Sequence, residues 1–195
     1  AAAVSAALPL FAQAQPVPDL DSLTAAQAAA DICAGKYTSE ALVGAALARA
    51  RARADLNAFI TLDEAGALKA AKAADAARKR GACKPLDGVP VVIKDNIEVA
   101  GLPASAGTPA LKGFVPKADA PVAAKLRAAG AIVLGKTNMH ELAFGISGYN
   151  LAFKSGAQPG VRNAYDPTRI AGGSSSGSGA AIGARIALAG LGTDT

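Results

Sequence analysis

Two short segments of the chain carry side chains that could do acid–base or nucleophilic chemistry, and the first centres on Lys94. Lys94 directly follows an apolar run at residues 89–93, which is interrupted only by Pro90. A lysine on a buried strand is costly as a cation, and desolvation lowers its pKa. A lysine amine that is neutral at working pH can accept a proton. The alternative is an ordinary lysine whose side chain reaches water from the end of the strand, and the strand pattern leaves both interpretations open.

The second segment is the run GGSSSGSG at residues 172–179, which precedes an apolar stretch at residues 180–187. Such a run could be a flexible linker, an anion-binding loop at the start of a helix, or a loop that presents catalytic hydroxyl groups. The linker is disfavoured because the residues that follow are apolar enough to belong to the core. The run also lacks the Gly-Lys-Ser/Thr of a phosphate-binding loop and the Gly-x-Gly-x-x-Gly of a dinucleotide fold.

The histidine and cysteine content narrows the chemistry further. His140 is the single histidine of the chain, which disfavours a Ser-His-Asp triad, and lysine is the known substitute base in serine hydrolases. The two cysteines, Cys33 and Cys83, form no Cys-x-x-Cys pair and supply too few ligands for a zinc site. Two unpaired, partly buried thiols are the default expectation, although the spacing leaves a disulfide open.

The composition indicates a folded domain. Hydrophobic residues make up 51% of the 195 residues and charged residues 18%, which excludes a disordered chain. The net charge is +5, and a basic balance permits nucleic-acid binding without requiring it. Its densest cationic groups, around residues 49–53 and 78–80, fall where helices are expected to end, which favours solvated helix termini over a nucleic-acid surface.

Helical and strand patterns alternate along the chain and must position these residues. Predicted helices begin at caps: Ser22 or Thr24 for the first, Thr38 or Ser39 for the second, then Asp63 and Asp119. Predicted strands are short and continuously apolar. The expected helices cover residues 24–34, 39–54, 63–81, 120–129, 137–142 and 180–187, and the expected strands cover residues 58–62, 89–93, 131–134 and 188–192. A long loop at residues 145–167 is rich in Gly, Asn and Pro. This alternation predicts an α/β fold with a largely parallel sheet covered on both faces.

The first residues have the character of an export signal. The stretch AAAVSAALPLFAQA at residues 1–14 resembles the apolar part of a secretory signal and ends in an Ala-x-Ala cleavage pattern. We expect residues 1–18 to be a signal-peptide remnant and linker, and residues 19–195 to be the N-terminal part of a single domain. The expected location is periplasmic or secreted. The alternative is a disordered, alanine-rich leader on a cytoplasmic protein.

Taken together, the segments that carry reactive side chains indicate a function more specifically than any one of them alone. The chain resembles the amidase signature family through five ordered motifs: GVPVVIKDN at 88–96, GKTNMHELAFG at 135–145, RNAYDPTR at 162–169, GGSSSGSG at 172–179 and LGTDT at 191–195. The resemblance covers residues 24–195. It implies an α/β/α sandwich around a mixed, largely parallel sheet, of which this chain would hold the N-terminal part. Two departures are Asn163-Ala164 in place of the usual Asn-Pro, and Ser176 in place of a glycine.

The resemblance also implies a Ser–cis-Ser–Lys triad that hydrolyses an amide to an acid and ammonia through a seryl acyl-enzyme. Lys94 matches the catalytic lysine, and Ser174 matches the bridging serine, whose preceding peptide bond is cis in the family. Gly172, Gly173 and Ser175 would form the supporting loop. The family's nucleophilic serine follows Gly-Thr-Asp-x-Gly-Gly, so it would lie beyond Thr195, the one residue of the oxyanion-binding run present here. We therefore expect this chain alone to be inactive.

The implied requirements of the complete protein are few. No metal or cofactor is expected, and the expected partner is a small-molecule amide substrate, with no nucleic acid and no membrane; a homodimer is left open. Two alternatives remain from the sequence. One is a protein similar to the A-subunit of an amidotransferase, which handles ammonia for a tRNA-linked substrate. The other is a non-catalytic binding protein that keeps the amidase fold.

Overall fold

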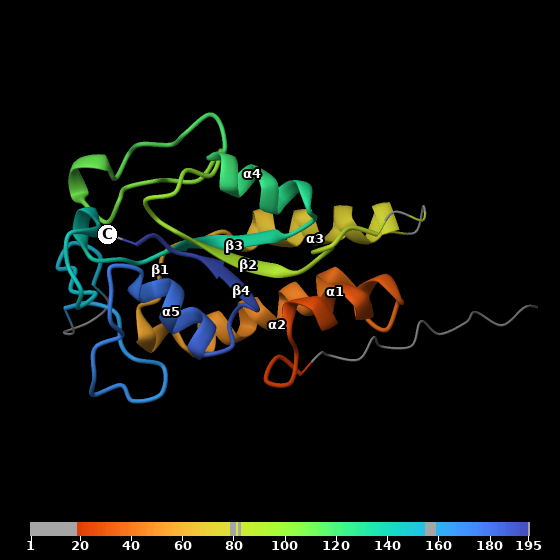
Figure 1. Ribbon diagram of the computed structural model, residues 1–195, viewed down its shortest axis with the longest axis horizontal. Helices are drawn as coiled ribbons and strands as arrows, with labels where there is room; N and C mark the ends of the chain where they lie inside the picture. The colour runs from red at the N-terminus through yellow and green to blue at the C-terminus, as the bar shows by residue number, and fades with distance from the viewer. Residues whose placement is uncertain (1–18, 79–80, 82, 155–158, 195) are drawn as a thin grey trace, which may run out of the picture.

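The computed structural model describes residues 19–78, 81, 83–154 and 159–194 (Figure 1). In this part of the chain, a four-stranded sheet has the order β1-β3-β2-β4. Its strands are β1 (Phe59–Leu62), β2 (Pro90–Lys94), β3 (Ile132–Thr137) and β4 (Ala189–Leu191). Strand β2 is parallel to both β3 and β4, whereas β1 is antiparallel to β3. The fold is α/β with a mixed, largely parallel sheet, as the sequence predicted.

The two central strands are buried along their whole length. Every residue of β2 and β3 is buried, which explains why these strands read as continuous apolar runs rather than alternating patterns. Their register pairs Ile93 with Lys136 and Lys94 with Thr137. Neighbouring residues along a strand point to opposite faces, so Lys94 and Thr137 share one face and Lys136 lies on the other.

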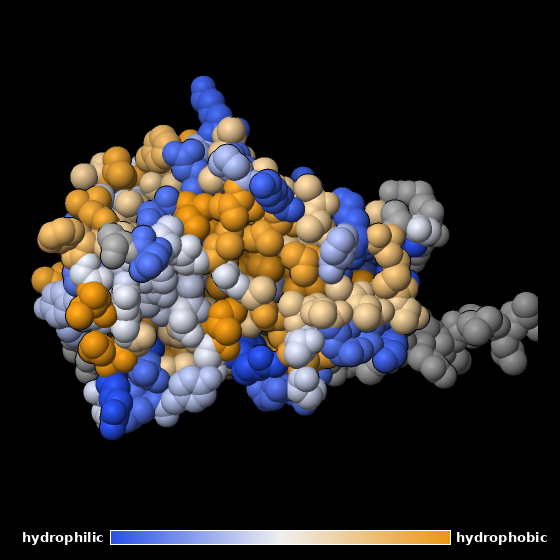
Figure 2. Space-filling model, viewed as in Figure 1, coloured by the Kyte–Doolittle hydropathy of each residue, from blue (hydrophilic) through white to orange (hydrophobic). Residues whose placement is uncertain are grey.

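Helices pack around this sheet in positions close to the predicted ones. They are α1 (Ala25–Cys33), α2 (Ser39–Ala52), α3 (Glu64–Arg78), α4 (Pro121–Ala128) and α5 (Ser176–Gly183). In Figure 1, α4 lies above the sheet, and α2 and α5 lie below it. Thr24 and Thr38, each one of two candidates left open by the sequence, cap α1 and α2 through their side-chain oxygens. Hydrophobic surface remains visible between α4 and the strands (Figure 2).

Two predicted local features are wrong. Asp119 does not cap α4, because its carboxylate accepts hydrogen bonds from the Ala100 N–H and from Arg127 instead. No helix starts at Thr137 or Asn138, since β3 continues through Thr137. The Asn138 side chain then bonds backbone groups of the neighbouring segments, and only a 3₁₀ turn, Glu141–Ala143, follows.

The helix predicted at residues 180–187 begins earlier, at Ser176, and ends at Gly183. The second half of the glycine- and serine-rich run, residues 176–179, therefore forms the start of α5, and residues 172–175 form the loop that leads into it. Gly177 explains why small residues are needed, because a Cβ there would lie 2.3 Å from the Ala58 carbonyl oxygen and 2.5 Å from the Asn138 nitrogen. The Gly177 N–H donates to the Asn138 carbonyl at 2.8 Å, so the helix start is fastened to the end of β3.

Cys33 and Cys83 form a disulfide, with a Cα–Cα distance of 5.8 Å, and both residues are exposed. The default expectation of two unpaired, partly buried thiols is wrong. The bond ties the end of α1 to the segment between α3 and β2. The predicted leader and linker at residues 1–18 lie outside the described residues. None of the helices in the described ranges has the length and apolar character needed to span a bilayer.

Candidate active site

Lys94 ends β2 and is completely buried. Thr137 of β3 pairs with it in the sheet, and none of the Lys94 side chain is exposed to solvent. This desolvation lowers the pKa of Lys94 below the ordinary value of 10.5. The alternative of a strand-end lysine that reaches water does not describe this side chain.

The Lys94 ammonium lies 2.6 Å from the hydroxyl oxygen of Ser174. Ser174 belongs to the loop that leads into α5, and the Gly173–Ser174 peptide bond is cis, as the family resemblance implied. The Ser174 carbonyl accepts a hydrogen bond from the His140 N–H at 3.1 Å. Gly173 packs against the backbone of Gly148, where a Cβ would come within 2.7 Å of the nitrogen. The loop is thus held on both sides of the cis bond.

Sequence reasoning missed a second hydroxyl partner of Lys94, Thr193. Its Oγ1 lies 2.7 Å from the Lys94 nitrogen and also accepts a hydrogen bond from the Asn96 amide at 3.3 Å. Thr193 follows β4, and Asn96 lies two residues beyond Lys94. A signal was available, because the carboxyl ends of parallel neighbouring strands meet at the same edge of a sheet.

Hydroxyl groups also fasten α5 and its loop to the strand ends. The Ser175 hydroxyl donates to the Thr193 carbonyl at 3.1 Å and accepts from the Thr193 N–H at 3.1 Å. Ser178 and Thr137 share a hydrogen bond of 2.7 Å, and Ser178 donates to the Leu191 carbonyl at 3.0 Å. The serines of the run at residues 174–178 therefore join three strands to one helix.

A cavity of about 390 Å³ opens beside Ser174. One side is formed by the rim segment, which we define as residues 143–146 and which supplies Phe144 and Ile146. The residues that line the cavity are Ala143, Phe144, Gly145, Ile146, Gly173, Ser174, Thr193 and Asp194. Phe144 and Ile146 are largely exposed, and apolar side chains in the same cavity as the Ser174 hydroxyl suit a substrate with an apolar body and one polar reacting group.

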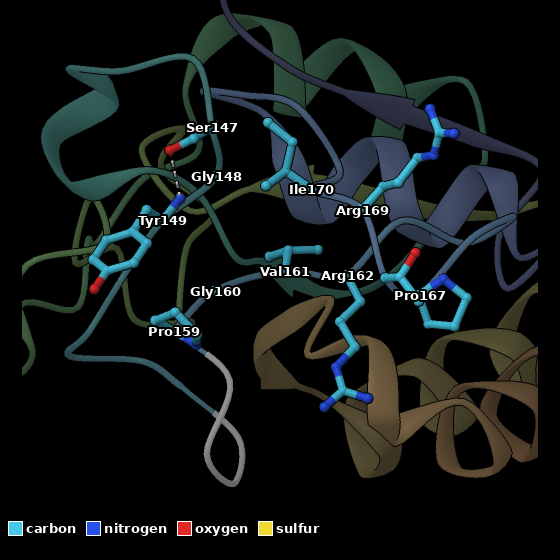
Figure 3. A pocket seen from close by; sticks show the side chains of 11 residues that line it. Ser147, Gly148, Tyr149, Pro159, Gly160, Val161, Arg162, Pro167, Arg169 and Ile170 are labelled. Carbon is cyan, nitrogen blue, oxygen red and sulfur yellow. Dashed lines mark hydrogen bonds between the residues drawn. The ribbon is translucent and has the colours of Figure 1, made fainter.

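A smaller cavity of about 120 Å³ lies within the long loop and contains neither Lys94 nor Ser174. Figure 3 shows its lining, with the Tyr149 N–H donating to the Ser147 hydroxyl. Arg162 and Arg169 extend in opposite directions there (Figure 3). This cavity lacks the paired amine and hydroxyl, so the larger cavity is the candidate active site.

The remaining predicted site residues have distinct positions. Gly172 and Gly173 lie in the cis loop, and Ser175 contacts Thr193 as described. Thr195 lies outside the described residues. His140 contributes its backbone N–H to Ser174, and its ring lies against Gly145, whose Cβ would be 2.3 Å from it. Within the described ranges, no group of three or more His, Cys, Asp or Glu side chains could hold a metal ion.

The fold and this lysine–serine pair define an amidase-like class of protein, and comparison with known proteins specifies it. A family model described as Amidase matches residues 41–195, and the chain belongs to this family. The mandelamide hydrolase of Pseudomonas putida is 52% identical over 187 residues, which are 95% of this chain and 36% of that protein.

Two further similarities broaden the comparison. The A-subunit of the glutamyl-tRNA(Gln) amidotransferase of Chloroflexus aurantiacus is 44% identical over 91% of this chain and 36% of its own length. The crystal structure of an amidase superposes with a TM-score of 0.81 at 44% identity, over 89% of this chain and 39% of that one. The chain thus spans little more than a third of the length of the curated relatives named here.

Proposed function

We propose that the complete polypeptide hydrolyses a linear carboxylic acid amide to the acid and ammonia through a seryl acyl-enzyme. The observation that carries this proposal is the 2.6 Å contact between the fully buried Lys94 amine and the Ser174 hydroxyl at the edge of a cavity. Family membership supports the same reaction class. The attacking serine would come from the polypeptide that follows Thr195, and this chain alone would not turn over.

Lys94 is proposed to act as the base in its neutral form. A neutral amine has one lone pair and two N–H bonds, so an N–H that donates to Thr193 leaves the lone pair free to accept from Ser174. Lys94 then takes the Ser174 proton while Ser174 takes the proton of the attacking serine. The serine oxygen bonds the amide carbon and forms a tetrahedral oxyanion.

Collapse of that intermediate breaks the C–N bond and leaves an acyl-serine. The proton held by Lys94 returns through Ser174 to the departing nitrogen, which leaves as ammonia. Water then attacks the acyl-serine by the same proton route and releases the acid. Each half of the reaction, acylation and deacylation, ends with Lys94 neutral again, so its lowered pKa and its burial serve both halves.

The substrate is proposed to be a primary amide with a small aryl or aliphatic acyl group. The cavity supplies an apolar wall at Phe144 and Ile146, and its volume of about 390 Å³ accommodates a single substituted ring. The similarity to a mandelamide hydrolase points to the same class, because mandelamide is a primary amide that carries one phenyl ring.

The protein is proposed to be periplasmic or secreted. The exposed Cys33–Cys83 disulfide supports this location, because disulfides persist in oxidising compartments and are rare in the cytosol. The signal-like stretch at residues 1–14 points the same way. Mass spectrometry of the complete protein isolated from periplasmic and cytosolic fractions tests this location.

A second candidate function is that of the A-subunit of an amidotransferase, which is favoured by the 44% identity to such a protein. The two functions differ in what happens to the ammonia. A free-standing amidase releases it into solution from simple amides, whereas the amidotransferase component transfers it within a complex to a tRNA-linked substrate. An export location would argue against the second function.

The test uses the complete polypeptide and a panel of aryl and aliphatic primary amides, with ammonia release as the readout. We expect Lys94→Ala and Ser174→Ala each to lose roughly 10³-fold or more in kcat. Lys117→Ala is the matched control, because Lys117 is exposed, and it should retain full activity. Retention of activity by Lys94→Ala would reject the assigned base.

A further inference from the structure

A second buried lysine lies behind the proposed active site and has no part in the mechanism above. Lys136 is completely buried on β3, and so is Asp95, the residue that follows Lys94. The Lys136 ammonium donates to the carbonyl oxygens of Asp95 and Pro103, at 3.1 and 3.0 Å. It also lies 3.8 Å from the Asp95 carboxylate. Burying either charge without a partner is strongly unfavourable, so a fully buried lysine–aspartate pair calls for a structural or functional explanation.

We propose that Lys136 and Asp95 form a positioning pair that aligns Lys94 and the cavity rim for the proposed amide hydrolysis. This inference rests on the proposed function. The pair acts through two linked sets of contacts, one toward Lys94 and one toward the rim segment.

The first set of contacts leads to Lys94. Lys136 holds the carbonyl of Asp95, which fixes the peptide plane that leads into Asn96. Asn96 donates to Thr193, whose hydroxyl oxygen lies 2.7 Å from the Lys94 nitrogen. A shift of the Asp95–Asn96 peptide would therefore move the acceptor that orients Lys94.

The second set of contacts begins at the turn that faces Asp95. One Asp95 carboxylate oxygen accepts from the Ser105 N–H, the Ser105 hydroxyl and the Gly107 N–H, at 2.9, 2.6 and 3.2 Å. Between these two residues, Ala106 has a φ of +50°, a left-handed conformation that residues with a side chain rarely adopt. The carboxylate clamps both ends of that unfavourable residue.

The clamped turn supports the cavity rim. The Ala106 carbonyl accepts from the Leu142 N–H at 2.8 Å. Leu142 and Ala143 also have positive φ values, of +54° and +58°, immediately before Phe144. Three of the five non-glycine residues with positive φ in the described ranges thus belong to this connected unit. Such conformations persist only where the surroundings fix them, and one line of fixing contacts runs from Leu142 through the Ala106 turn to Asp95.

The test compares Lys136→Met with the double variant Asp95→Asn/Lys136→Met in the complete polypeptide. Methionine keeps the length of the side chain and removes the donor. We expect Lys136→Met to lose about 100-fold in kcat with KM changed less than threefold, because a small misplacement of catalytic groups costs this much. The double variant removes the unpaired carboxylate, so its Tm should recover part of the loss while kcat remains low.

Hydrogen–deuterium exchange provides a readout that does not depend on activity. Loss of the pair should raise amide exchange in peptides that cover residues 96–107 and 138–147 and leave α1 and α2 unchanged. Ser105→Ala, a milder variant that keeps the fold if Lys136→Met does not, should raise exchange at residues 103–107 and lower kcat by about tenfold, the equivalent of one hydrogen bond. Lys117→Met is the control.

The outcomes separate the two proposals. Unchanged kcat and unchanged exchange in the folded variants would overturn the positioning role, as would a double variant that regains kcat together with Tm. If the parent protein hydrolyses no amide, the proposed function fails, and the exchange data alone then decide whether the pair holds the rim.

Discussion

Lys94 and Lys136 are the same residue type, equally buried, on adjacent strands of one sheet, yet their surroundings give them opposite characters. Lys94 contacts two hydroxyl oxygens, those of Ser174 and Thr193. Lys136 contacts two backbone carbonyls and lies beside a carboxylate. Burial lowers the pKa of both lysines, but for Lys136 the negative charges of Asp95 and Glu98 oppose the shift.

This contrast shows that burial alone does not make a lysine a base. A carboxylate neighbour stabilises the ammonium form and fixes it as a structural cation. Hydroxyl neighbours can donate as well as accept, so they serve the neutral and the charged amine alike. The face of the sheet on which each lysine lies, set by a one-residue difference in register, decides which neighbours it meets.

The largest expected effect comes from replacing each of the two lysines by methionine and comparing the two variants. Lys94→Met should abolish hydrolysis and change the free energy of unfolding little, because an apolar side chain replaces a poorly solvated amine. Lys136→Met should lower the free energy of unfolding by about 3–5 kcal/mol, because Asp95 is left as an unpaired buried charge. Denaturant titration of both variants measures the difference, and equal destabilisation would contradict the contrast.

The pH dependence sharpens the comparison. The proposed mechanism requires neutral Lys94, so kcat/KM should rise about tenfold per pH unit below the pKa of Lys94 and level off above it. Because burial lowers that pKa, the midpoint should fall below 10.5. An assay series over pH 5 to 10 with a non-ionising primary amide gives this midpoint. A rate that is constant over this range would indicate that no such group titrates.

Thr193 should have a smaller effect than Lys94. Thr193→Val keeps the shape of the side chain and removes the oxygen that Lys94 and Asn96 contact. A hydrogen bond to a charged group, here the ammonium that forms when Lys94 takes up the proton, contributes about 1.5–3 kcal/mol. Its loss predicts a decrease of roughly 10- to 100-fold in kcat. Thr193→Ser restores the oxygen and serves as the control, and it should recover most of the activity. Equal kcat values for Thr193→Val and Thr193→Ser would show that the Thr193 hydroxyl has no role in hydrolysis.

The disulfide should have the smallest effect on hydrolysis. It links cysteines 50 residues apart, and loop closure of this length stabilises a fold by about 4 kcal/mol in the chain-entropy account. The paired variant Cys33→Ser/Cys83→Ser should therefore have a lower Tm than the parent, while kcat stays within twofold below the unfolding temperature. A large loss of kcat at full Tm would connect the disulfide to the site.

Periodic apolar patterns made much of this fold predictable. Threonine caps and short buried strands placed α1, α2, β2 and β4 within a few residues of their observed bounds. The errors arose where tertiary contacts overrule local signals. Asn138 has the side chain of a helix cap but bonds segments distant in sequence, and Asp119 pairs with Ala100 and Arg127.

The site was predictable only in part. Lys94 follows an apolar run and Ser174 lies in a conspicuous loop, so both attract attention as residue types. Thr193 and Asn96 are ordinary in the sequence and acquire meaning only because β2 and β4 are neighbours. The pairing of Lys136 with Asp95 depends on the register between β2 and β3, which the sequence does not specify. The disulfide was also not predictable, because the sequence does not show that the end of α1 lies close to Cys83.

The most direct test of the central claim is an NMR titration of the Lys94 amine itself. In the complete polypeptide labelled with ¹³C-lysine, the Cε resonance of Lys94 can be assigned by its disappearance in Lys94→Arg and followed against pH. Our account predicts a titration midpoint below 10.5, because the amine is desolvated beside Ser174 and Thr193. A midpoint at or above 10.5 would show an ordinary ammonium group and contradict the assignment of Lys94 as the base.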